Sequence, residues 1–154
     1  MIKKTLEKIL KVGTIGCIIL LIASVLLQIF ARFFLEQAPS WTEEVSRLFF
    51  IFSVACAAPL ALKSNYYIHL DIFYNLMKPK LQKKVEFLVL VFTFLLFLVL
   101  SIAAVTFVEM GFDEKSPSMG IKMGIAFFSM LVLGVTMCFF ISLKLLKHIK
   151  KMST

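Results

Sequence analysis

The sequence predicts an all-α integral membrane protein with four transmembrane helices and both ends of the chain in the cytoplasm. Hydrophobic residues make up 60% of the 154 residues, whereas soluble domains contain about 45–50%. They are concentrated in four blocks separated by charged clusters, at about residues 12–34, 41–62, 86–108 and 122–143. Each block can cross the hydrocarbon layer as a helix, and none alternates in polarity as barrel strands do. We expect residues 1–154 to form one membrane domain.

The distribution of basic residues predicts the orientation. Thirteen of the 17 lysines and arginines lie in the two terminal tails and the central loop. The other two loops contain six of the nine acidic residues. The positive-inside rule therefore places both tails and the central loop in the cytoplasm. The net charge of +8 then indicates contact with anionic phospholipid headgroups and not with nucleic acid.

The N-terminal tail leads into the first predicted span, residues 12–34. Its apolar residues fall on one helical face, at Ile2, Leu6, Ile9 and Leu10. Its lysines lie mostly on the opposite face. Such a pattern predicts an amphipathic turn or two at the membrane interface. The tail after the fourth span repeats the pattern. A cleaved signal peptide is not expected, because the apolar stretch is too long and lacks a small-residue cleavage site.

The start of the second span is marked by local sequence signals. Pro39 stops the preceding helix, and Ser40 with Glu43 fits the capping box S-x-x-E. We therefore predict that this helix begins at Trp41. Trp41 would then lie at headgroup level, where its amphipathic ring is favoured. Acidic residues in the first turn are also favoured by the helix dipole.

A cluster of charged residues is predicted around this helix start. Glu43 and Glu44 precede Arg47 by four and three residues, so all three can share one helical face. Arg32, at the end of the first span, could complete the cluster. One interpretation is a helix cap with charged side chains reaching the interface. A second interpretation is a site that holds a protein partner. A third is a direct substrate or ion site.

The central loop contains a stretch too short to span the membrane, at about residues 66–77. On a helix its apolar residues form one broad face, which predicts a short amphipathic helix in the cytoplasmic interface. His69 falls within the apolar arc, and Asp71 lies about 200° away, so the two cannot form a local pair. For His69 we consider a structural hydrogen bond, contact with a partner, and metal binding or catalysis.

The first, third and fourth spans, at about residues 12–34, 86–108 and 122–143, contain no acidic residue, histidine or lysine within the membrane. Transport chemistry usually needs an ionisable residue within the membrane, so these spans indicate support and not conduction. The three cysteines lie in different spans without a C-x-x-C pair, which favours a packing role over redox chemistry.

Several of these residues together resemble a known family. They are Arg32-Phe33, Pro39-Ser40, the element Trp41-Thr42-Glu43-Glu44-Val45-Ser46-Arg47, the small-residue stretch Ser53–Ala58, and Tyr67-Ile68-His69-Leu70-Asp71. Their order and spacing are similar to those of the small membrane subunit, the Q-type or DctQ-like subunit, of tripartite ATP-independent periplasmic (TRAP) transporters. The segment 116–121 shows a weaker likeness.

The resemblance implies a multi-pass protein of the bacterial inner membrane that works with two partners. These partners would be a large membrane subunit and a periplasmic substrate-binding protein. The large subunit would move as an elevator and bind sodium and the solute, a carboxylate such as sialic acid or a C4-dicarboxylate. The small subunit would be a fixed brace that also helps dock the binding protein. It would be no enzyme and would bind no cofactor or metal itself.

Other classes of protein remain as alternatives. One alternative is a scaffold or assembly subunit of an unrelated membrane complex. Co-purification with a twelve-helix partner would distinguish a TRAP subunit from such a scaffold. A small four-helix exporter is another, although it would need a carboxylate in its first span, which this chain lacks. A membrane enzyme would need clustered catalytic groups at one depth. No residue in the chain identifies the solute.

Overall fold

The computed structural model describes residues 2–34, 39–63 and 78–152. These residues form four helices: α1 (Ile2–Phe34), α2 (Trp41–Lys63), α4 (Pro79–Gly111) and α5 (Gly124–Met152). Each is long and apolar enough to cross a membrane, so the predicted all-α membrane fold with four spans is confirmed. The predicted interfacial helix at residues 66–77, with His69 and Asp71, lies outside the described residues.

Three helices extend beyond the predicted spans. α1 begins at Ile2, so the amphipathic tail is the first part of one continuous helix. α5 likewise continues through the C-terminal lysines to Met152. α4 begins at Pro79, after Lys78 and before the predicted span that starts at about residue 86. Proline suits this position because its fixed φ is helical and its missing N–H would have had no acceptor there.

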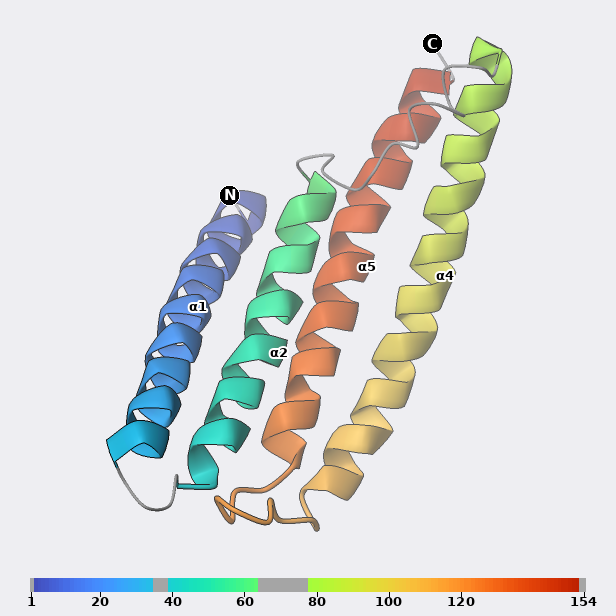
Figure 1. Ribbon diagram of the computed structural model, residues 1–154. Helices are drawn as coiled ribbons and strands as arrows, with labels where there is room; N and C mark the ends of the chain where they lie inside the picture. The colour runs from blue at the N-terminus through green and yellow to red at the C-terminus, as the bar shows by residue number, and fades with distance from the viewer. Residues whose placement is uncertain (1, 35–38, 64–77, 153–154) are drawn as a thin grey trace.

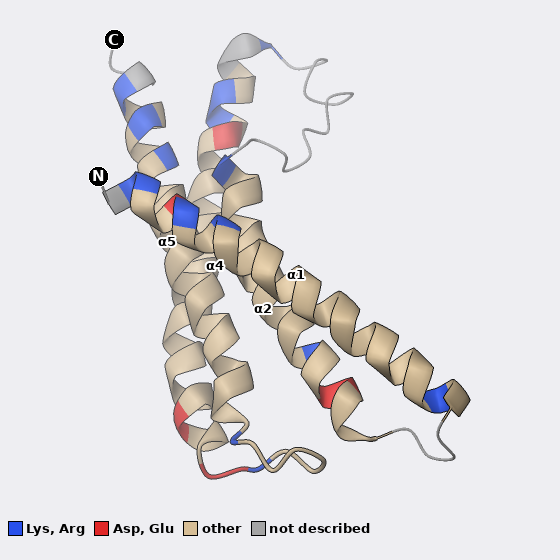
Figure 2. Ribbon diagram, turned by 90° about the vertical axis from the view of Figure 1, so that its left-hand side faces the viewer, with Lys and Arg blue, Asp and Glu red and all other residues tan. Residues whose placement is uncertain are grey.

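The helices lie side by side in the order α1, α2, α5, α4 (Figure 1). Antiparallel pairs α1–α2 and α4–α5 form two hairpins, and α2 packs against α5 to join them. Both termini lie at the same end of the bundle. Seen from the side, the two hairpins diverge toward the other end (Figure 2). We call the end with the termini the basic end and the other the Glu44 end.

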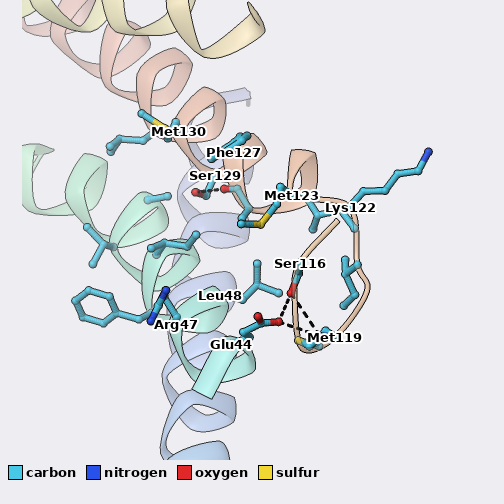
Figure 3. Close-up of a pocket in the computed structure, with 18 of the residues that line it drawn as sticks. Glu44, Arg47, Leu48, Ser116, Met119, Lys122, Met123, Phe127, Ser129 and Met130 are labelled. Carbon is cyan, nitrogen blue, oxygen red and sulfur yellow. Dashed lines mark hydrogen bonds between the residues drawn. The ribbon is translucent and has the colours of Figure 1, made fainter. Parts of the chain in front are cut away.

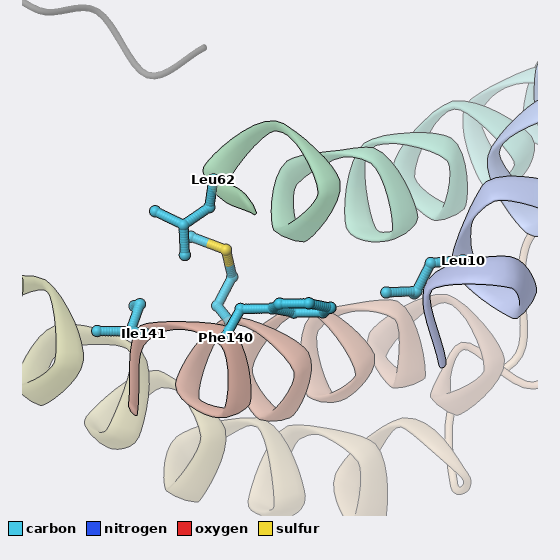
Figure 4. Packing of buried hydrophobic residues seen from close by; sticks show 5 residues of the cluster. Leu10, Leu62, Phe140 and Ile141 are labelled. Carbon is cyan, nitrogen blue, oxygen red and sulfur yellow. The ribbon is translucent and has the colours of Figure 1, made fainter. Parts of the chain in front are cut away.

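The hydrophobic core lies toward the basic end. It contains five buried side chains from three helices: Leu10, Leu62, Met137, Phe140 and Ile141 (Figure 4). Nearby, Lys63 Nζ of α2 lies 2.6 Å from Glu7 Oε2 of α1. The ion pair joins α1 to α2 within one hairpin, and the core packs α1 and α2 against α5, so side-chain packing holds the two hairpins together at this end.

Glycine allows close helix approach in the α1–α2 hairpin. A Cβ added at Gly13 would lie 3.3 Å from Cys56 Sγ and 4.0 Å from Cys56 Cβ. Small residues at helix interfaces permit this kind of van der Waals packing in membranes, where burial from water supplies no driving force between helices. At Gly16, one turn further along α1, an added Cβ would meet nothing within 4 Å.

This geometry predicts a disulfide between helices. In a chain with Cys17 and Cys138 replaced by alanine, Gly13→Cys is expected to crosslink to Cys56 on oxidation, because disulfide Cβ atoms lie about 3.5–4.5 Å apart. Mass spectrometry of the intact chain would detect the loss of two hydrogens. Gly16→Cys in the same background is the control and should stay reduced. Equal crosslinking of both variants would contradict the helix register.

Candidate functional site

Helix α2 begins at Trp41, as predicted. At its start, Thr42 donates two hydrogen bonds to the carbonyl of Pro39, from its backbone N at 3.2 Å and its hydroxyl at 2.7 Å. Thr42 is only 1% exposed, whereas Trp41 is 43% exposed. Within the described part of the chain, Ser40 and Glu43 form no hydrogen bond with each other. The helix start is therefore correct, but Thr42 and not the capping box secures it.

The predicted charge cluster separates into two parts. Glu43 and Arg47 pair as expected, with Arg47 Nη2 3.3 Å from Glu43 Oε1. Both side chains are mostly exposed, at 67% and 72%. Glu44 does not join them, because its carboxylate is hydrogen-bonded to a different part of the chain. Arg32 is exposed at the end of α1 and forms no ion pair with any described residue.

Glu44 is bound instead by the loop between α4 and α5 (Figure 3). The Ser116 hydroxyl donates a hydrogen bond to Glu44 Oε2. The backbone N of Met119 lies 3.0 Å from the same oxygen, and that of Ser118 lies 3.1 Å from Oε1. Hydrogen bonds to a carboxylate are stronger than those between neutral groups. We call this set of four residues the Glu44 clamp.

The shape of the loop places these donors. An isolated β-bridge joins Lys115 and Lys122, and Ser116 N donates to Ile121 O at 2.8 Å. Gly120 closes the turn with its N 3.0 Å from Ser116 O, at a φ of 66°. Glycine adopts this left-handed conformation without steric cost. The turn therefore holds the amides of residues 118 and 119 toward Glu44.

The Glu44 clamp connects the two hairpins at the end where they diverge. Glu44 is on α2, and its partners follow α4, 72 to 75 residues later in the sequence. The hairpins are therefore tied at both ends of the bundle, by the core at one end and by the clamp at the other. Sequence analysis missed these partners, although the Ser-Pro-Ser-Met-Gly turn in a short loop was a possible signal.

Between the core and the clamp lies a cavity of about 640 Å³. Helices α2 and α5 supply most of its wall, which is largely apolar, and Glu44 and Arg47 lie along it (Figure 3). Leu48, Ile51 and Val54 contribute from α2, and Ala126 and Met130 from α5.

Four buried hydroxyls in the bundle are satisfied locally. The buried hydroxyls of Thr42, Ser53, Ser129 and Thr136 each donate to a backbone carbonyl three or four residues earlier. In the described ranges, no group of three or more His, Cys, Asp and Glu residues is placed to bind a metal ion. The three cysteines are free thiols.

Comparison with known proteins identifies the family. The family model for the DctQ component of tripartite ATP-independent periplasmic transporters matches residues 21–151. A protein of Haemophilus influenzae named "Putative TRAP transporter small permease protein" is 20% identical over 152 residues, which cover 99% of this chain and 92% of that protein. The four apolar helices agree with a membrane component. The chain therefore belongs to the DctQ family and is a multi-pass small subunit of a TRAP transporter in the bacterial inner membrane.

Proposed function

We propose that this subunit is a fixed brace for the large membrane subunit of a sodium-coupled TRAP transporter for carboxylate solutes, such as sialic acid or C4-dicarboxylates. The observation that carries the proposal is the local satisfaction of the four buried hydroxyls. Each donates its proton to a backbone carbonyl three or four residues away, so none has a proton left to donate to a solute. Sodium and the solute would then bind to the partner subunits.

The outer helices supply the apolar surface that a brace needs. Large apolar side chains are exposed along α1, such as Ile19 at 60% and Leu26 at 61%, and along α4, such as Val99 at 64% and Ile102 at 66%. In the membrane this surface contacts lipid or the large subunit. Because the hairpins are tied at both ends, the subunit can present this surface in a constant shape.

The charges support an orientation with both termini in the cytoplasm. Lysines are concentrated at the basic end of the bundle (Figure 2), where the positive-inside rule predicts the cytoplasmic face. The Glu44 end would then face the periplasm. There the exposed Trp41 and the exposed Glu43–Arg47 pair are available to help dock the substrate-binding protein.

The test is uptake by the complete three-component system in proteoliposomes with a sodium gradient. Replacement of Trp41, Glu43 or Arg47 is expected to abolish uptake by loosening the complex, which size-exclusion chromatography would measure. Lys4→Gln, at the basic end, is the control and should leave uptake unchanged. Loss of uptake with the complex and binding-protein docking intact would refute the brace. Uptake by this subunit alone would refute it as well.

The solute class needs a separate measurement. Recognition would lie in the substrate-binding protein, so calorimetric titration of that protein with sialic acid and with C4-dicarboxylates would identify the solute. If neither class of compound released heat on titration, this part of the proposal would be contradicted. The proposal of a brace would be unaffected.

A further inference from the structure

We propose that the cavity between α2 and α5 binds a phospholipid of the surrounding leaflet, with one acyl chain inside and the phosphate at Arg47. This inference does not depend on the transported solute or on docking of the binding protein. It follows from the lining of the cavity, from the charges along it and from its size.

The lining suits a hydrocarbon chain. Leu48, Ile51 and Val54 on one side and Ala126 and Met130 on the other present aliphatic or thioether surface. The nearby buried hydroxyl of Ser129 donates to Ala126 O at 2.6 Å, so it is engaged within its own helix. Most of the wall is formed by two helices that can span the membrane, and the loop between α4 and α5 lines the end near Glu44. Along the helices, hydrocarbon and not water surrounds the protein.

The Arg47 guanidinium at the cavity wall can bind an anion. The Glu44 carboxylate is directed to Ser116, Ser118 and Met119 in the clamp. Arg47 has five N–H donors, and its pair with Glu43 is exposed and therefore weak. A guanidinium can hold a phosphate through two parallel hydrogen bonds. An anionic headgroup is thus the complementary ligand.

The depth of Arg47 is also suitable. It follows Trp41 by six residues, which corresponds to about 9 Å along a helix. Tryptophan is favoured at headgroup level, and a long arginine side chain can extend from a deeper position back toward the interface. A phosphate at Arg47 would therefore lie near the ordinary depth of the headgroups, with its chain directed along the cavity.

The size of the cavity suits a lipid chain. At about 640 Å³ it falls within the range of small-molecule sites, about 300–1,000 Å³. An acyl chain is much thinner than a helix, which is about 10 Å wide, and it can follow the groove between α2 and α5.

The binding experiment uses the full chain in a neutral detergent, titrated with dioleoyl phosphatidylglycerol and followed by native mass spectrometry. Arg47→Gln, which removes the phosphate partner, and Val54→Trp, which fills the cavity, are each expected to weaken the first lipid-binding step about tenfold. Ala126→Leu is a second filling variant in case the first does not fold. Arg32→Gln and Val99→Trp are matched controls outside the cavity and should change binding less than twofold. Any other pattern overturns the proposal.

A crosslinking experiment distinguishes the possible occupants in the assembled complex. A photoreactive benzophenone amino acid replaces Val54, and the membranes are irradiated before purification. A phospholipid adduct on the chain supports the proposal. An adduct with the large subunit, an adduct with a second copy of this chain, or the absence of any adduct overturns it.

Discussion

Replacement of Glu44 by alanine is expected to release the loop between α4 and α5 from α2. The amides of Ser118 and Met119 and the hydroxyl of Ser116 would lose their acceptor. Hydrogen exchange reports the free energy of local opening, so these two amides are expected to exchange at least about tenfold faster. Mass spectrometry with peptide separation would measure the change in the full chain.

Glu43→Ala is the matched control for this prediction. Glu43 is the neighbouring carboxylate on the same helix, but it pairs only with Arg47 and is mostly exposed. Its removal should leave exchange in residues 112–123 unchanged. Ser116→Ala should have an intermediate effect, because the two backbone donors keep their acceptor. If the loop exchanged equally in wild type and Glu44→Ala, the clamp would not hold the hairpins together.

The second large effect is expected at Gly134, where α4 and α5 approach closely. A Cβ added at this glycine would collide with Ser101 Oγ and lie 3.2 Å from Ser101 Cα, which is backbone and cannot rotate away. Gly134→Val should therefore separate the helices. Overpacking of this kind lowers the free energy of unfolding by about 1–3 kcal/mol, which detergent or thermal unfolding of the purified chain would measure.

Gly16→Val is the control for Gly134→Val, because an added Cβ at Gly16 meets nothing within 4 Å. It carries the same change in helix propensity without the collision. The double variant Gly134→Ala with Ser101→Gly should recover most of the stability that Gly134→Ala alone loses, since the colliding side chain is gone. Equal stability of the two valine variants would contradict the close approach of α4 and α5.

The described fold was largely predictable because membrane spans are local features. Four apolar blocks identified the four helices, and Pro39 with the Ser40–Glu43 spacing identified the start of α2 at Trp41. The helix ends were less predictable. An amphipathic tail has the same periodicity whether it lies in the interface or continues a span, so the start of α1 at Ile2 could not be recognised. Pro79 was ambiguous because proline both ends and begins helices.

The candidate site was predicted only in part. The Glu43–Arg47 pair follows from helical spacing within one element. The partners of Glu44 lie 72 or more residues away, and helical spacing contains no information about such contacts. The cavity depends on how far the two hairpins diverge, which is also a property of the tertiary arrangement. The functional roles of Arg32, Trp41, His69 and Asp71 remain predictions.

The Glu44 clamp is formed by two segments that lie far apart in the sequence. One half is a carboxylate near the start of α2, and the other is a serine and two amides in a turn that needs glycine at position 120. Neither half has these contacts alone. A chimera that takes α2 from one family member and the loop between α4 and α5 from another would therefore keep all four spans and the core but lose the contact between the hairpins at the Glu44 end. The two segments should be exchanged, and should diverge in evolution, as a single unit.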